Sequence, residues 1–165
     1  MCPEHCSGIG LLSHEQHLVH ADIKPANVFI CKNGQIKLID FNIAFPIARL
    51  EAGDDHTARI LGRYGAVTPL YSSPQRLAGE EPSKSDDIFS LATLAYIALT
   101  GERPFGDRNA REAKEQGLAP IKPGAIPAAT WRVLEKALQF GDEARMQDIR
   151  EFASAFAAKR TWSLF

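Results

Sequence analysis

An acid, a base and an amide side chain stand close together in HADIKPAN, residues 20–27. They are Asp22, Lys24 and Asn27, and a second carboxylate, Asp40, follows a short apolar run. A carboxylate beside a phosphate can accept the proton of an attacking hydroxyl, and a lysine can offset the charge that moves onto the transferred group. Amide and carboxylate oxygens suit Mg²⁺, which takes its other ligands from water and substrate phosphates. The pattern predicts phosphoryl transfer, with Asn27 and Asp40 as metal ligands.

A β-hairpin is expected to bring Asn27 and Asp40 together. Two runs rich in strand-forming residues, VFI and QIKLI, lie on either side of CKNG. Asn33 and Gly34 suit a two-residue type I′ turn, because both central residues of that turn need a positive φ. Counting back along both strands sets Asn27 opposite Asp40, with Cβ atoms about 5 Å apart. The alternative is a surface hairpin whose polar residues only cap the ends of the strands.

The whole stretch HADIKPANVFICKNGQIKLIDFN resembles the catalytic loop and metal-binding loop of protein kinases, with the signature H-R-D-L-x-x-x-N followed by D-F-G. The resemblance implies that Asp22 is the catalytic base and that Asn27 and Asp40 bind magnesium. It also implies that Lys24 contacts the phosphate, as in serine/threonine kinases. The implied cofactors are ATP and Mg²⁺, and the implied acceptors are Ser/Thr hydroxyls of a protein substrate.

TPLYSSPQ, residues 68–75, is similar to the end of a kinase activation segment, which would span 40–75. In the family a threonine of this segment hydrogen-bonds near the catalytic base and helps to seat the peptide, and Thr68 occupies that position. The segment ends in the family with a glutamate that pairs with an arginine. Here Gln75 and Arg145 occupy the two positions, so we expect a hydrogen bond to a neutral acceptor in place of an ion pair.

The strongest helix signal spans about residues 84–100. Its ends carry capping serines, acidic residues that suit the positive end of the helix dipole, and a terminal glycine: Ser83 or Ser85, Asp86 with Asp87, and Gly101. Its mostly apolar composition predicts burial nearly all round. In kinases the matching helix is the central post of the large lobe, and Asp87 is similar to the aspartate that holds the catalytic loop, where His20 is a further supporting residue. The alternative for Asp87 is a simple charge at the helix N-terminus.

Three weaker helical segments follow, a polar surface segment at 108–116 and core-facing segments at 128–140 and 148–158. The predicted fold is mainly α with short β-hairpins, a kinase-like C-terminal lobe built around the buried helix. We expect a leader over 1–10, the lobe over 11–158 and a tail over 159–165. Within the lobe lie the catalytic loop 20–27 and the metal loop 40–42.

Composition limits the other possibilities. The 165 residues are 45% apolar and carry a net charge of -1, which suits one globular domain and gives no reason to expect a nucleic acid partner. The longest apolar run is well short of the ~20 residues that cross a bilayer, so no membrane span is expected. Three cysteines in a domain of this size favour a reducing, cytoplasmic location. Cys2, His5 and Cys6 are not assigned a zinc ion, since no second ligand pair follows.

The resemblance covers residues from about 11 to 156, but the family's small lobe has no counterpart here. GIGLL near the N-terminus does not follow a strand and lacks a third glycine, and no lysine strand is present. The sequence also departs from the family pattern at Ala21 and Asn42, where many kinases have arginine and glycine. We therefore expect weak or no activity from this chain alone, with a separate small lobe or partner chain completing it. A truncated pseudokinase scaffold is the alternative, and a small-molecule phosphotransferase is less favoured because of Lys24-Pro25 and segment 68–75.

Overall fold

The computed structural model of the chain describes residues 18–32, 36–40, 45–46, 68–124 and 126–157. Several sequence expectations concern positions outside these ranges. They include the leader 1–10 with Cys2, His5 and Cys6, the Asn33-Gly34 turn, Asn42, most of the activation segment, and the tail 159–165.

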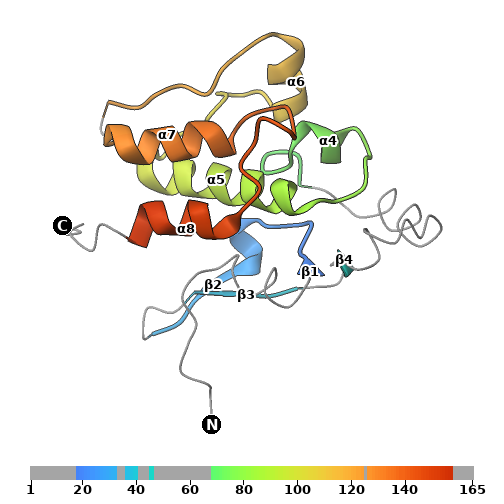
Figure 1. Ribbon diagram of the computed structural model, residues 1–165, viewed down its shortest axis with the longest axis vertical. Coiled ribbons are helices and arrows are strands. Elements are labelled where there is room, and N and C mark those ends of the chain that lie inside the picture. The colour runs from blue at the N-terminus through green and yellow to red at the C-terminus, as the bar shows by residue number, and fades with distance from the viewer. Residues whose placement is uncertain (1–17, 33–35, 41–44, 47–67, 125, 158–165) are drawn as a thin grey trace.

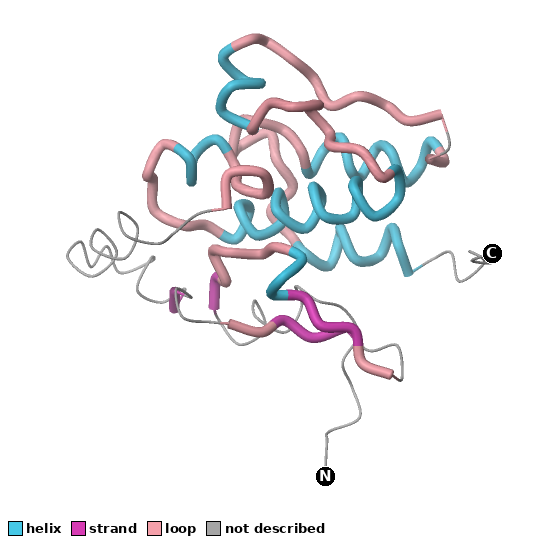
Figure 2. The backbone as a smooth tube through the Cα atoms, turned by 180° about the vertical axis from the view of Figure 1, so that it is seen from behind, coloured by secondary structure: helices cyan, strands magenta, loops and turns pink. Residues whose placement is uncertain are grey.

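Helices and strands occupy separate parts of the molecule (Figure 1). The helices are α4 (Pro74–Leu77), α5 (Lys84–Thr100), α6 (Ala110–Glu115), α7 (Ala128–Ala137) and α8 (Ile149–Ala157). The strands are β1 (Leu18–Val19), β2 (Val28–Ile30), β3 (Ile36–Leu38) and β4 (Phe45–Pro46), with a short 3-10 helix η1 (Pro25–Asn27) before β2. Figure 2 shows from behind that the strand pairs lie on one side of the helical layer. The prediction of a mainly helical fold with short hairpins is confirmed for the described residues.

The β2–β3 hairpin is present, but its register differs from the predicted one. The antiparallel pairs are Val28 with Leu38, Phe29 with Lys37 and Ile30 with Ile36. Ile39 therefore lies opposite Asn27, and its N–H donates to the Asn27 carbonyl at 2.9 Å. The prediction that Asn27 faces Asp40 is wrong by one residue. The reason is the length of the connection. Residues 31–35 lie between the paired residues Ile30 and Ile36, which is an odd number, whereas a connection closed by a two-residue turn has an even number.

A second antiparallel pair, β1 with β4, was not predicted from the sequence. It joins Leu18 to Pro46 and Val19 to Phe45. Strands of two residues are too short to show a hydrophobic periodicity, so they cannot be recognised from the sequence. The pair matters for the site because β1 leads directly into His20.

Helix α5 begins and ends at the residues that its capping signals indicate. Ser83 is the N-cap and forms a capping box with Asp86, in which each side chain accepts a hydrogen bond from the other residue's N–H. Gly101 follows the last turn with φ 73°, a left-handed conformation that glycine adopts without a steric penalty. No helix in the described ranges is both long and apolar enough to cross a bilayer.

The prediction that this helix is buried nearly all round holds only for its first half. Residues 85–93 are all buried, whereas beyond Thr93 only Tyr96 is. The first half contacts the loop at His20 and the start of α4, while Tyr96 packs edge-on against Trp131 of α7. Apolar composition marks a helix as buried but does not show which turns have neighbours on every side.

The remaining helices complete the core. Helix α7 contacts both α5 and α8, and α6 contacts α4. Helix α6 buries only Ala110 and Ala113, so it is the surface helix that its polar composition predicts. The two segments predicted to face the core form α7 and α8 and do face it, since Trp131, Leu134 and Phe152 are buried.

Candidate active site

Three side chains converge on the carboxylate of Asp22. Lys24 donates from Nζ to Oδ2 at 2.6 Å, and Asn27 donates from Nδ2 to the same oxygen at 3.3 Å. Thr68, from a distant part of the chain, donates from Oγ1 to Oδ1 at 3.2 Å. The Asp22 side chain remains 11% exposed and that of Lys24 27% exposed. Asp22, Lys24 and Asn27, three of the residues whose types suggested phosphoryl transfer, therefore share with Thr68 one small site that solvent can reach.

The loop that carries Asp22 is held by the first turn of α5. Asp87 is buried, and its two carboxylate oxygens accept the N–H groups of His20 at 2.8 Å and Ala21 at 2.9 Å. Ala21 has φ 68°, in the left-handed region that residues with a Cβ rarely adopt. These hydrogen bonds fix the peptide groups directly before Asp22. They are the contacts that the resemblance implies for Asp87, and they go beyond a simple helix-end charge.

His20 links the Asp22 loop to the strand that precedes Asp40. Its ring is fully buried, the Asp22 N–H points at Nδ1 at 3.4 Å, and Nε2 lies 3.2 Å from the Ile39 carbonyl oxygen. A backbone N–H can only donate and a carbonyl can only accept, so both contacts are hydrogen bonds in the tautomer in which Nε2 donates to Ile39 and Nδ1 accepts from Asp22. Both peptide groups of Ile39 are thus anchored, one by His20 and the other by Asn27.

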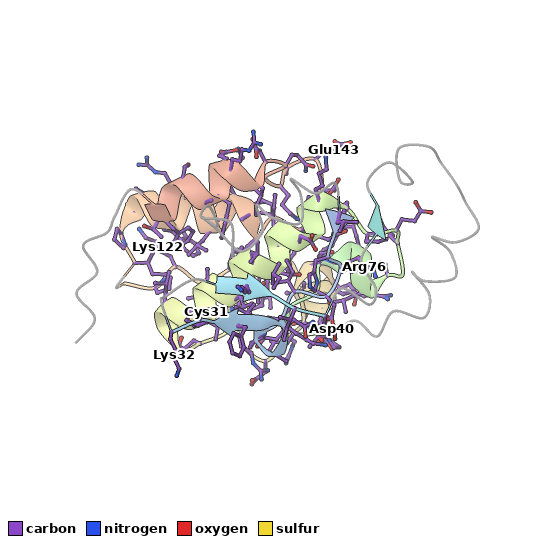
Figure 3. All side chains as sticks on the ribbon, turned by 90° about the horizontal axis from the view of Figure 1, so that it is seen from below. Cys31, Lys32, Asp40, Arg76, Lys122 and Glu143 are labelled. Atoms are coloured by element: carbon purple, nitrogen blue, oxygen red, sulfur yellow. The ribbon has the colours of Figure 1, made fainter. Side chains whose placement is uncertain are left out.

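Asp40 follows Ile39 at the point where the chain leaves the ladder. Its φ is 65°, again in the left-handed region, and its side chain is exposed. Figure 3 shows Asp40 at one end of the hairpin and Cys31 with Lys32 at the other. Although Asp40 does not face Asn27 across the ladder, the anchored Ile39 keeps it next to the Asp22 loop.

The side chains of Asn27 and Asp40 fit the donor chemistry of a magnesium site. The Asn27 amide is buried and uses its Nδ2 group on the backbone and side-chain oxygens of Asp22, at 2.9 and 3.3 Å. This orientation leaves the side-chain oxygen Oδ1 available as a ligand, since it accepts no hydrogen bond from the described residues. Oδ1 of Asn27 and the exposed Asp40 carboxylate are hard oxygen donors of the kind that Mg²⁺ prefers. Within the described ranges, this site included, no group of three or more His, Cys, Asp or Glu side chains could hold a metal ion.

The segment after Thr68 is folded back on itself. The Tyr71 N–H and the Ser72 hydroxyl both donate to the Thr68 carbonyl, at 3.0 and 2.9 Å. Ser73 is the N-cap of α4 and accepts from the Arg76 N–H at 3.1 Å, with proline at the first helical position. Helix α4 was not predicted, although a serine followed by proline is a helix-start signal that could have revealed it.

Arg145 joins the end of this segment to the core. Its Nη2 donates to Gln75 Oε1 at 2.8 Å, the neutral hydrogen bond expected from the sequence. Nη1 donates to Asp86 Oδ1 at 3.2 Å, a contact that sequence reasoning missed because Asp86 was assigned only to the helix dipole. Burial lowers the pKa of Arg145, and the carboxylates of Asp86 and Asp142 oppose that shift.

Comparison with known proteins gives consistent results. The profile of the protein kinase domain family matches residues 4–153. Serine/threonine-protein kinase PknB of Mycolicibacterium smegmatis is 39% identical over 93 residues, which cover 56% of this chain and 14% of the relative. PknA of Corynebacterium glutamicum is 34% identical over 150 residues, and PknA of Mycobacterium tuberculosis is 30% identical over 152 residues. These two alignments cover 89% and 90% of this chain, but only 30% and 34% of the relatives.

Proposed function

The chain belongs to the protein kinase family, and we propose that it is the catalytic lobe of a serine/threonine protein kinase, which transfers the γ-phosphate of ATP to protein hydroxyls. The observation that carries the proposal is the convergence of Lys24, Asn27 and Thr68 on the Asp22 carboxylate. Each of these side chains is of the type that one part of phosphoryl transfer requires. The central helix α5 fits the post of a kinase large lobe, since its Asp87 holds the Asp22 loop.

Asp22 is the proposed base for the incoming hydroxyl. A carboxylate offers about four acceptor positions, and the described contacts use two on Oδ2 and one on Oδ1. The remaining position on Oδ1 lies beside Thr68, so an acceptor hydroxyl bound there would be next to the threonine that positions the peptide. Asp22 would take the hydroxyl proton as the oxygen attacks the phosphate.

Lys24 and the metal ligands would offset the negative charge of the phosphoryl group during transfer. The Lys24 ammonium is a donor that can turn from Asp22 to the phosphoryl group and offset the charge developing there. Asn27 Oδ1 and the Asp40 carboxylate would hold Mg²⁺ with ATP. When bound, the Mg²⁺–ATP pair supplies the phosphoryl group and its neutralising cation.

The curated relatives are much longer than this chain, which spans about a third of their length or less. We therefore propose that a small lobe, on a longer form of the protein or on a partner chain, completes the ATP site, and that the isolated chain is weakly active. The proposed setting is the cytoplasm, with protein substrates and without nucleic acid. Two other functions remain as outcomes of the test: a pseudokinase scaffold and a small-molecule phosphotransferase.

The test is transfer of labelled γ-phosphate from ATP and Mg²⁺ to Ser/Thr peptides, by the chain alone and with an added small lobe from a homologous kinase. We expect transfer with the small lobe and a loss of at least 100-fold in Asp22→Asn, because a positioned base contributes roughly 10²–10⁴-fold. Asp107→Asn makes the same chemical change at an exposed position and should leave the rate unchanged.

Two results would overturn the proposal. Absence of label on every peptide, with or without the small lobe and at any magnesium concentration, would favour the scaffold. Label on an aminoglycoside-type small molecule but on no peptide would favour the small-molecule phosphotransferase.

A further inference from the structure

Two consecutive aspartates at the start of α5 hold two different parts of the candidate active site. Asp87 accepts the N–H groups of His20 and Ala21 and so fixes the loop of Asp22. Asp86 is equally buried, but its carboxylate turns to the other side of the helix end and contacts Ser73 and Arg145. The site thus has a separate carboxylate for each of the segments that meet at Asp22.

The contact between Asp86 and Ser73 is short and buried. Ser73 Oγ donates to Asp86 Oδ1 at 2.5 Å, and both residues are almost completely removed from solvent. The same Ser73 oxygen accepts the Arg76 N–H, so one hydroxyl joins Asp86 to the start of α4. The other oxygen of Asp86, Oδ2, accepts the N–H and the hydroxyl of Ser83. A hydrogen bond to a charged acceptor is roughly twice as strong as a neutral one, so this carboxylate is a firm attachment point.

From Ser73 the connection continues to Asp22. Ser72, its neighbour in the chain, donates its hydroxyl to the Thr68 carbonyl at 2.9 Å. Thr68 in turn donates to Asp22 Oδ1 at 3.2 Å. Displacement of Ser73 would therefore move the residue that stands beside the open acceptor position of Asp22.

Asp86 is also the closest buried counter-charge of Arg145 among the described residues. The Arg145 side chain has no exposed surface, and its contact at the end of the segment, Gln75, is neutral. Asp86 Oδ1 lies 3.2 Å from Arg145 Nη1 with a side chain only 2% exposed, whereas Asp142 is 3.9 Å away and half exposed. A buried arginine needs a close counter-charge, and among the described residues Asp86 is the buried one.

We propose that Asp86 is a positioning residue for the acceptor peptide, holding Thr68 beside Asp22 through Ser73 while it neutralises Arg145. Asp87 holds the base and Asp86 holds the segment that receives the substrate. This assignment rests on the proposed kinase function, because the acceptor is a peptide only if the chain is a protein kinase.

Amide hydrogen exchange at single residues tests the positioning without any need for activity. In Asp86→Asn we expect exchange at least tenfold faster at Tyr71 and Leu77, whose N–H groups bond to Thr68 and Ser73, with His20 and Ala21 unchanged. Asp87→Asn should give the reverse pattern. If both variants accelerate the same amides, or if Tyr71 and Leu77 are unaffected in Asp86→Asn, the inference is overturned.

Two further variants keep the test decisive. Ser73→Ala removes the contact from the other side and should reproduce the exchange pattern of Asp86→Asn, and it decides the question if the Asp86 variant does not fold. Ser90→Ala is the matched control. Ser90 is a buried serine of α5, the helix of Asp86, and its hydroxyl donates to the backbone carbonyl of Asp86 and not to the carboxylate. Faster exchange at Tyr71 in the Ser90 variant, or normal exchange in Ser73→Ala, would contradict the assignment.

Kinetics then separates positioning from a merely structural role. In the chain supplemented with a small lobe, Asp86→Asn should raise KM for the peptide at least threefold and leave KM for ATP unchanged. Equal changes in both constants would overturn the positioning role. If the unmodified chain transfers no phosphate even with the small lobe, the proposed function fails, whereas the exchange experiment still reports whether Asp86 holds the segment.

Discussion

At the scale of single residues, the site is a set of donors arranged around one acceptor. Asp22 accepts hydrogen bonds from a lysine, an amide and a hydroxyl, and of the residues that donate them only Asn27, which ends η1, lies in a helix or strand. Thr68 is the member that comes from furthest along the chain. Its hydrogen bond to Asp22 is therefore the contact that joins the substrate segment to the proposed base.

Replacement of Thr68 tests that contact. A hydrogen bond to a charged group contributes about 1.5–3 kcal/mol, so Thr68→Ala should lower kcat/KM for a peptide acceptor by roughly 10- to 100-fold. Thr68→Ser keeps the hydroxyl and should retain most of the activity. Equal activity in the alanine and serine variants, measured with the supplemented chain, would show that the hydroxyl does not position the acceptor.

At the scale of elements, α5 organises the site through its N-terminal turn. The N-terminal turn carries both aspartates that anchor the active-site segments, and the C-terminal end is terminated by Gly101 in the left-handed conformation. The glycine N–H donates to the Ile97 carbonyl at 2.8 Å, which satisfies a carbonyl that the helix itself leaves open.

Gly101→Ala should lower the free energy of unfolding by about 1–2 kcal/mol, the cost of the left-handed conformation for a residue with a Cβ. An added Cβ would meet no atom within 4 Å, so the effect is conformational and not steric crowding. Urea denaturation measures it. Gly124→Ala is the control, since Gly124 also has open space around it but no positive φ. The free energy of unfolding of this variant should be unchanged or higher by up to about 1 kcal/mol. Equal losses in both variants would contradict this account.

At the scale of the whole molecule, the β2–β3 hairpin leaves apolar side chains uncovered. Phe29 is 57% exposed and Ile30 70% exposed, and neighbouring strand residues point to opposite faces, so each face of the hairpin carries an exposed apolar side chain, although Leu38 of β3 packs against the core. Ile39 is also 46% exposed. A two-stranded hairpin gains little stability by itself and normally packs against another layer.

This surface predicts self-association of the isolated chain. Sedimentation velocity over a concentration series should show association that the double variant Phe29→Lys and Ile30→Lys reduces. Ile121→Lys changes a similarly exposed residue, at 60%, on the loop between α6 and α7, and should associate like the unmodified chain. A clean monomer at high concentration for the unmodified chain would contradict the prediction.

The sequence alone was sufficient to predict features that depend on residues close together in the chain. The capping serine, the terminal glycine and the apolar run define α5, and the spacing of Asp22, Lys24 and Asn27 suggested the chemistry, because neighbouring residues in a tight loop cannot lie far apart. The catalytic roles of these residues remain predictions.

The tertiary structure decided the features that depend on contacts between distant parts of the chain, namely the register of the hairpin and the contacts of Asp86. A one-residue difference in register moved Ile39, not Asp40, opposite Asn27, and strand register is set by the connection and by packing as well as by the turn sequence. Asp86 and Asp87 have the same side chain in adjacent positions, so composition could not tell them apart. The resemblance implies that Asp87 holds the Asp22 loop, but only the fold showed that Asp86 contacts Ser73 and Arg145, because successive residues of a helix point in directions about 100° apart.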